Sequence, residues 1–243
     1  MTHDLRAPAG SPVAFALDLP DLDAARRVAE VVAPHVGMLK IGLELFVAHG
    51  PAVVAPLREL GLPIFLDLKL HDIPETVERA VARASALGVS LLTVHAAGGR
   101  AMLERAVARA DREGAGLSVC AVTVLTSLDA ADARDIGLAR SPSETVPKVA
   151  RLAFDAGVRA FVCSPAEVAG LRTDLGPDAV LVTPGVRPAN SEAGDQKRTT
   201  TPAAAIAAGA TWLVVGRPIR DAERPADAAR AISAEARSAR GAS

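Results

Sequence analysis

The feature that most constrains the fold is an alternation of short apolar runs and helix-like segments, repeated eight times along the chain. Such an alternation is typical of a parallel sheet whose strands are joined by helical crossovers. The expected strands are Val13–Leu17, Met38–Ile41, Ile64–Leu68, Leu91–Val94, Leu117–Val124, Ala160–Cys163, Val180–Thr183 and Trp212–Val215. The expected helices cover residues 22–32, 51–60, 74–87, 101–112, 142–154, 165–175, 202–208 and 225–240.

Eight such units favour closure of the sheet into a barrel, with an open, doubly wound sheet as the alternative. The length of 243 residues is close to the usual size of one eight-fold α/β barrel. No shift in composition and no long linker divides the chain. We therefore expect one domain over residues 1–243, with residues 1–11 and 238–243 as loose termini.

Composition argues against several classes of protein. A net charge of -1 and an aromatic content of 2% are unlike a nucleic-acid-binding surface. No apolar run is long enough to span a membrane, and the first residues lack the pattern of a signal peptide. Cys120 and Cys163 lie in apolar runs, which predicts buried free thiols in a reducing cytoplasm. The chain has no cysteines and histidines at the short spacing of a zinc site.

In a barrel of this kind the working residues lie at the carboxyl ends of the strands and in the loops that follow. Polar or conformationally special residues stand at these positions in nearly every unit. They are Asp18, Lys40, Asp67, Lys69, Asp72, His95, Thr126, Ser164, Pro184, Gly185, Arg187, Gly216 and Arg217. Their recurrence at one edge predicts the active face of the barrel.

The third expected strand carries an unusual group of charges, in the stretch Phe65-Leu-Asp-Leu-Lys-Leu-His-Asp-Ile-Pro74. Leucines alternate with Asp67 and Lys69, which predicts the leucines on one face and the two charges on the other. With Asp72, and with Lys40 one strand earlier, they form a candidate acid–base chain. Flanking carboxylates keep a buried lysine protonated, which suits a reaction that ends by delivering a proton to carbon. The alternative is a structural salt-bridge network, although buried ion pairs rarely give net stability.

Two loops at the same edge suggest a bound phosphate. A long polar loop over residues 184–198 follows the seventh strand, and loops of this length are commonly closing lids. Gly216-Arg217-Pro218 follows the eighth strand and offers backbone N–H groups and a guanidinium to a dianion. The alternative is a solvated loop with a surface arginine. Thr126 and Ser127 either bond a ligand or cap a short helix, and His95 is equally consistent with a packed core histidine.

Together these motifs resemble the orotidine 5'-phosphate decarboxylase family. The resemblance covers nearly the whole chain, and its most specific parts are the block from Asp67 to Pro74 and the loop Gly194-Asp-Gln-Lys-Arg198. Further matching motifs are Leu17-Asp18, Leu39-Lys-Ile-Gly42, Thr93-Val-His-Ala96, Ala121-Val-Thr-Val-Leu-Thr-Ser127, Thr183-Pro-Gly-Val-Arg-Pro188 and Val214-Val-Gly-Arg-Pro218.

The resemblance implies a single-domain (β/α)8 TIM barrel of the ribulose-phosphate-binding type and a cytoplasmic homodimer. It implies a carboxy-lyase that converts orotidine 5'-phosphate to UMP and CO2 in de novo pyrimidine biosynthesis, with neither a metal nor an organic cofactor. Lys69 is the implied proton donor to C6 of the pyrimidine, within a catalytic network of Lys40, Asp67, Lys69 and Asp72. The segment from Asp72 to Thr76 is implied to reach the site of the neighbouring subunit. The implied substrate-binding residues are Asp18, Lys40, Asp67, Ile73, Thr76, Thr126, Pro184, Arg187, Gln196, Gly216 and Arg217.

Two rival functions stand beside this one. Related phosphate-binding barrels, the sugar-phosphate decarboxylases and synthases, share a similar acid–lysine–acid strand but use Mg²⁺. They typically carry an acidic residue where this chain has Lys40, so a metal ion here would lack charge balance. The other rival is a non-catalytic barrel that senses UMP, which has no evident need for the complete acid–lysine network.

Overall fold

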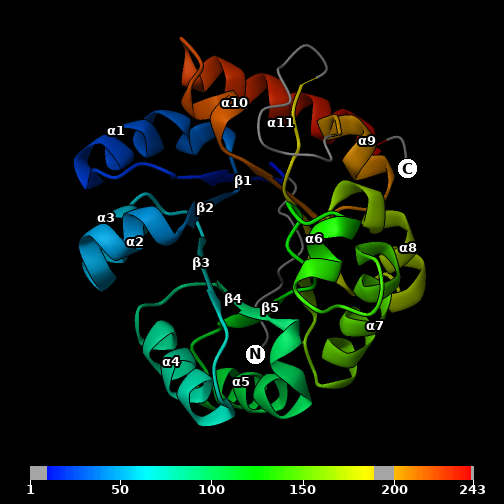
Figure 1. Ribbon diagram of the computed structural model, residues 1–243. Helices are drawn as coiled ribbons and strands as arrows, with labels where there is room; N and C mark the ends of the chain where they lie inside the picture. Colours follow the sequence, from blue (N-terminus) through cyan, green and yellow to red (C-terminus); the bar gives the residue numbers. More distant parts are fainter. Residues whose placement is uncertain (1–9, 189–199, 242–243) are drawn as a thin grey trace.

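The chain folds, in a computed structural model, into a closed barrel of eight parallel strands surrounded by helices (Figure 1). The structure describes residues 10–188 and 200–241. The strands are β1 Val13–Ala16, β2 Met38–Ile41, β3 Ile64–Leu70, β4 Leu91–His95, β5 Ser118–Val122, β6 Ala160–Val162, β7 Val180–Thr183 and β8 Trp212–Val215. Each strand pairs with its neighbours in sequence, and β1 pairs with β8, as in Ala14 opposite Val214, to close the ring. Closure confirms the predicted barrel and excludes the open sheet.

Helices and short 3-10 turns connect the strands and cover the outside of the barrel. The α-helices are α1 Leu22–Val32, α2 Leu43–His49, α3 Val54–Arg58, α4 Pro74–Ala86, α5 Gly99–Glu113, α6 Ala130–Asp135, α7 Pro142–Asp155, α8 Val168–Leu175, α9 Pro202–Ala207, α10 Arg217–Arg220 and α11 Pro225–Gly241. The 3-10 turns are η1 Ala33–His35, η2 Gly50–Val53, η3 Ala96–Gly98 and η4 Pro165–Glu167. Among the described helices, none has the length and apolar character needed to cross a membrane.

Local sequence signals account for where several helices begin. The Asp21 carboxylate accepts a hydrogen bond from the backbone N–H of Ala24 at 2.7 Å and so caps α1. Ser141 and Glu144 form the expected capping box at the start of α7, with Pro142 in its first turn. These caps satisfy backbone N–H groups that the first turn of a helix leaves without a partner.

The helix expected over residues 51–60 is wrong in its extent. The structure has α2 from residue 43, then the η2 turn, then α3, which ends at residue 58. Gly50 ends α2 with a φ of 62°, a conformation that favours glycine, and Pro51 starts the next turn. The sequence also left α10 unpredicted, because a four-residue helix is too short to show an apolar period.

The core has two layers, as the alternation of side chains along barrel strands requires. The outer layer lies between strands and helices and includes Leu66, with Leu68 and Leu70 packed against it, as the alternation on β3 predicted. The inner layer fills the barrel with side chains from every strand. Its members are Ala14, Met38, Phe65, Leu91, Cys120, Ala160, Val180, Val182 and Trp212.

The described ends of the chain are tied to the barrel. The buried hydroxyl of Ser11 lies 2.7 Å from that of Ser233 on α11, and α11 itself continues to Gly241. Residues 10–11 and 238–241, which belong to the expected loose termini, lie within this described part of the chain. Residues 1–9 and 242–243 lie outside the described residues, and the limits of the domain stay a prediction.

Candidate active site

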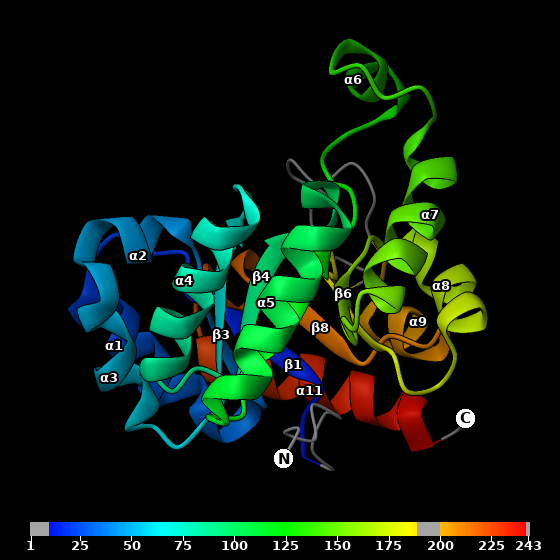
Figure 2. The same ribbon diagram turned by 90° about the horizontal axis from the view of Figure 1, so that it is seen from below.

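A cavity of about 420 Å³ lies at the carboxyl ends of the strands. Helix α6 projects above this face of the barrel, as Figure 2 shows. The cavity brings together ten of the thirteen edge residues that the sequence singled out, among them Gly185. The full set is Asp18, Lys40, Asp67, Lys69, Thr126, Pro184, Gly185, Arg187, Gly216 and Arg217. The predicted gathering at one edge of the barrel is therefore observed for these residues.

Charged side chains from three strands or their ends form one connected network in this cavity. The Lys69 ammonium lies 2.8 Å from each oxygen of the Asp67 carboxylate. The Lys40 ammonium lies 3.6 Å from Asp67 Oδ2 and donates to Asp18 Oδ1 at 3.1 Å. The chain of contacts therefore alternates in sign, from Asp18 through Lys40 and Asp67 to Lys69.

Asp67 is the centre of the network. Its side chain is 13% exposed, and burial alone raises the pKa of a carboxyl group. The charges of Lys40 and Lys69, with hydrogen bonds from Lys69 and Thr93, outweigh burial and hold the pKa of Asp67 below its ordinary value. Asp67 is consequently ionised at neutral pH and fixes a negative charge between two lysines.

The backbone of Lys69 is distorted where its side chain enters the network. Its φ is 50°, the left-handed region that a lysine rarely adopts, and among the described residues it is the one non-glycine with a positive φ. The pairing of β3 with β4 shifts register here: Leu66 is opposite Leu92, but Leu70 is opposite Val94. Such a bulge redirects a side chain, and bulges are common next to active sites.

Two arginines give the cavity an electropositive side. Burial lowers the pKa of Arg187, and the nearby charge of Arg217 lowers it further. Guanidinium groups that repel each other beside a cavity favour an anion that both can bind. Gly216 precedes the first turn of α10, and Gly185 has a φ of 78° in the turn that leads to Arg187.

Thr126 and Ser127 both line the cavity, so either hydroxyl is placed to meet a ligand. His95 does not line it. The His95 ring lies 5.3 Å from the ring of His71, and burial, followed by the charges of His71 and Lys69, lowers its pKa against an opposing effect of Asp67. This geometry agrees with the packed-histidine alternative.

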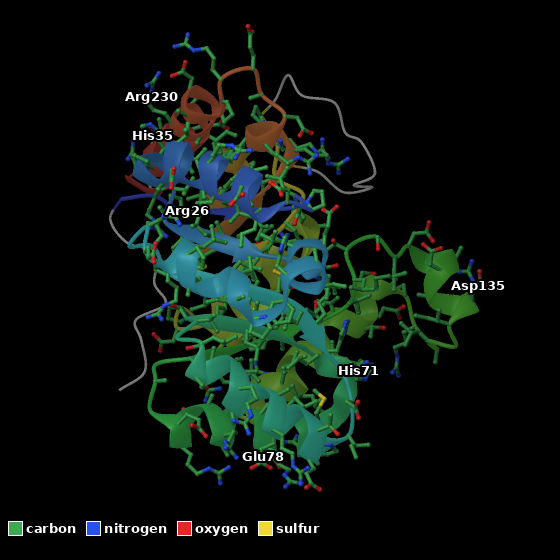
Figure 3. All side chains as sticks on the ribbon, turned by 90° about the vertical axis from the view of Figure 1, so that its left-hand side faces the viewer. Arg26, His35, His71, Glu78, Asp135 and Arg230 are labelled. Atoms are coloured by element: carbon green, nitrogen blue, oxygen red, sulfur yellow. The ribbon has the colours of Figure 1, made fainter. Side chains whose placement is uncertain are left out.

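Asp72, Ile73 and Thr76 do not line this cavity. Asp72 is exposed and accepts a hydrogen bond from the backbone N–H of Ile73, and Ile73 is 66% exposed. A separate, open hollow is lined by His71, Asp72 and Ile73. His71 lies on the side of the molecule from which the helix of Asp135 projects (Figure 3). Within the described part of a single chain, the network therefore ends at Lys69.

Sequence reasoning missed three residues that shape the site. Arg220 lines the cavity and donates to the backbone carbonyl of Asp18 at 2.8 Å. Gly42 allows Asp18 and Lys40 to meet, since a Cβ at residue 42 would lie 3.0 Å from both charged groups. Thr93 is buried and bonds Asp67. The motifs around Gly42 and Thr93 were visible, but nothing in a sequence shows which of their atoms approach.

Two further expectations concern the loop after β7 and a bound metal ion. Gln196 and the loop over residues 189–198 lie outside the described residues. Over the residues that are described, no group of three or more His, Cys, Asp and Glu side chains could hold a metal ion.

This chain is of the class of enzymes built on an eight-stranded parallel barrel, with charged side chains gathered at the carboxyl ends of the strands. Residues 11–232 match the sequence profile described as "Orotidine 5'-phosphate decarboxylase / HUMPS family". The chain belongs to that family, as its motifs predicted.

Individual relatives agree with the family assignment. A protein of Anaeromyxobacter sp. (strain K), named orotidine 5'-phosphate decarboxylase, is 57% identical over 222 residues, which cover 91% of this chain and 96% of the relative. One of the same name from Thermobifida fusca (strain YX) is 51% identical, with 93% and 95% covered. The crystal structure of orotidine 5'-phosphate decarboxylase from Lactobacillus acidophilus superposes with a TM-score of 0.82 at 36% identity, covering 93% of this chain and 99% of that one.

Proposed function

We propose that this chain decarboxylates orotidine 5'-phosphate to UMP and CO2, and that Lys69 protonates C6 of the pyrimidine after CO2 has left. The names of the relatives from Anaeromyxobacter and Thermobifida support a carboxy-lyase with this reaction. One observation carries the mechanism: the Lys69 ammonium is held by both oxygens of Asp67, at 2.8 Å, inside a cavity that Arg187 and Arg217 also line.

The cavity suits the two ends of a nucleotide. Arg187 and Arg217 carry the charge needed for the phosphate, and the backbone beside Gly216 adds N–H groups. Asp18 and Lys40 would hold ribose hydroxyls, since a carboxylate and an ammonium supply an acceptor and a donor side by side. Thr126, together with Pro184, would contact the base.

The reaction needs stabilisation of negative charge on carbon. The bond between C6 and the carboxylate breaks, CO2 leaves, and the electron pair stays on C6. The Lys69 ammonium donates a proton to form the C6–H bond, and the neutral amine then takes a proton from water. A cation fixed beside C6 favours the transition state, and phosphate binding far from C6 supplies energy for orienting the ring.

The proposal includes a homodimer in which Asp72 and its neighbours complete the site of the partner. Asp72 and Ile73 are exposed and lie outside the cavity of their own chain, which leaves them available to another. The Ile73 side chain is apolar and exposed, so contact with a partner subunit would remove apolar surface from water.

The direct test is an absorbance assay of the purified chain on orotidine 5'-phosphate. We expect turnover by the wild type, loss of turnover in Lys69→Ala, and UMP binding to Lys69→Ala by calorimetry. Lys148→Ala is the matched control, because Lys148 is an exposed lysine on α7. Near-normal turnover in Lys69→Ala would overturn the proposed mechanism.

The same assay separates the rival functions. A UMP sensor would bind UMP without turning over the substrate. A Mg²⁺-dependent barrel enzyme would lose activity in excess EDTA, whereas we expect activity to be retained because the Lys40 ammonium lies beside Asp67, where a metal ion would need another acid.

A further inference from the structure

One hydroxyl group links the side chain and the backbone of the acid–lysine pair. The backbone N–H of Lys69 donates to Thr93 Oγ1 at 2.8 Å, and Thr93 Oγ1 donates to Asp67 Oδ1 at 3.0 Å. Asp67 Oδ1 in turn accepts from the Lys69 ammonium at 2.8 Å. The three residues close a ring of hydrogen bonds that begins and ends at Lys69.

The direction of each bond in this ring is fixed by chemistry. A backbone N–H can only donate, so the Thr93 hydroxyl accepts there. An ionised carboxylate can only accept, so the hydroxyl proton points to Asp67. Thr93 is fully buried on β4, and no alternative partner is needed to satisfy its hydroxyl.

The ring coincides with the distorted part of β3. Between Leu66 and Leu70 the pairing of β3 with β4 shifts register, which interrupts the regular pattern of backbone hydrogen bonds between the two strands. The Lys69 N–H bonds a side chain of β4, and its φ is 50°. A sparsely populated conformation persists only where its surroundings hold it, and Thr93 supplies the contact at this point.

We propose that Thr93 is a positioning residue for the decarboxylation, and that its hydroxyl fixes both the Asp67 carboxylate and the backbone that aims the Lys69 amine. Thr93 does not line the cavity and acts through these two residues. This inference rests on the proposed function, because its kinetic readout is turnover of orotidine 5'-phosphate.

The experiment compares Thr93→Val, which keeps the shape, with Thr93→Ser, which keeps the hydroxyl. We expect Thr93→Val to lower kcat by roughly 10- to 100-fold, the loss expected for one hydrogen bond to a charged group, with little change in UMP affinity. Thr93→Ser should stay within about three-fold of the wild type. Thr123→Val is the control, because Thr123 is a buried threonine whose hydroxyl bonds only the carbonyl of Val162 among the described contacts.

The pH profile separates positioning from packing. Since the Thr93 hydrogen bond helps to lower the pKa of Asp67, its loss should move the acid limb of kcat to higher pH in Thr93→Val. If packing mattered instead, Thr93→Ser would be the more damaged variant, and that order of activities would overturn the proposal. An unchanged kcat in Thr93→Val would do the same.

A second measurement does not depend on the reaction. Backbone amide exchange at Lys69 should be slow in the wild type and Thr93→Ser and faster in Thr93→Val, or in Thr93→Ala if the valine variant does not fold. Equal exchange in all of these variants contradicts the positioning role. An inactive wild type with the expected exchange pattern would instead refute the proposed function and leave the structural link standing.

Discussion

The Lys69 ammonium lies 2.8 Å from both oxygens of Asp67, although the two residues are separated by only one position on the same strand. An isolated pair of this kind would gain little, but Lys40 and Thr93 also contact Asp67 and hold its carboxylate in one orientation. The left-handed backbone of Lys69 costs about 1–3 kcal/mol, which the surrounding contacts must offset. The strained backbone of Lys69 is thus accompanied by a fixed direction of its amine.

The first prediction concerns stability in acid. The pKa of Asp67 is lowered in the folded chain, since its lysines outweigh its burial. Its stabilising effect is therefore complete above the unfolded pKa of about 3.9 and is lost as pH falls through the lower folded pKa. At pH 7 the free energy of unfolding of Asp67→Asn should be about 3 kcal/mol lower than that of the wild type. This difference should narrow below about pH 4.

Denaturant titrations of both proteins across this pH range measure the gap. Asp135→Asn, at an exposed carboxylate on α6, is the control and should follow the wild type at every pH. A gap between wild type and Asp67→Asn that stays constant from pH 7 to acid would show that the charge of Asp67 does not stabilise the fold.

The second prediction concerns the phosphate. Arg217→Ala should weaken UMP binding by roughly 10- to 100-fold, because a charge-assisted contact to a dianion is lost. Uridine, which lacks the phosphate, is the matched ligand and should bind both proteins with equal affinity. Calorimetry with the two ligands gives the comparison. The phosphate assignment is wrong if UMP affinity does not change.

The third prediction uses the close approach at Gly42. The backbone there has a φ of -92°, which alanine can adopt, so Gly42→Ala should fold normally. Its Cβ would press on Asp18 and the Lys40 ammonium from 3.0 Å, and we expect turnover to fall by about ten-fold. Gly170→Ala, with open space around its Cβ, should be active. Steady-state kinetics and thermal melting of both variants decide between these outcomes.

The fourth prediction tests the shared site. If Asp72 serves the partner, a mixed dimer of Lys69→Ala and Asp72→Ala subunits contains one doubly defective site and one intact site. Mixing the two inactive variants under exchange conditions should then restore about a quarter of wild-type activity, since half of the dimers are mixed and each has one intact site. Mixing Lys69→Ala with Asp67→Ala should restore nothing, because both residues belong to the same site. Failure of the first mixture to gain activity, in dimers shown to exchange, rules out sharing.

The fifth prediction concerns the two free cysteines. Burial raises the pKa of Cys163 to about 12 and that of Cys120 well above its usual value. The thiolate is the reactive form, so neither thiol should react with a disulfide reagent in the native protein at pH 8. Both should react once the protein is denatured. Rapid modification of either residue in the native state would contradict the burial described here.

The strands could be predicted from the sequence because most of them are compact apolar runs between polar turns, and the barrel repeats that pattern eight times. Met38–Ile41 and Val180–Thr183 are predicted to the residue. The split of α2 from α3 was missed, since Gly50 and Pro51 act through backbone conformation and not through hydrophobic period.

The site was predictable where charge marked it and not where geometry did. Asp67 and Lys69 stand out as charges within a strand, whereas Thr93 is an ordinary strand former until its partners across β3 are known. Nor does the sequence show that the backbone of Lys69 adopts a left-handed conformation. Asp72 lies outside the cavity of its own chain, so its place in a shared site stays a prediction.

The inner layer of the barrel closes the lower end of the cavity. Met38, Phe65 and Trp212 fill the barrel below the cavity, so among the described residues the floor is packed and not open to the opposite face. Substrate, CO2 and UMP would then all pass through the carboxyl-end face of the barrel. A molecule of UMP that has not departed blocks the next substrate, and inhibition by the product should be strictly competitive.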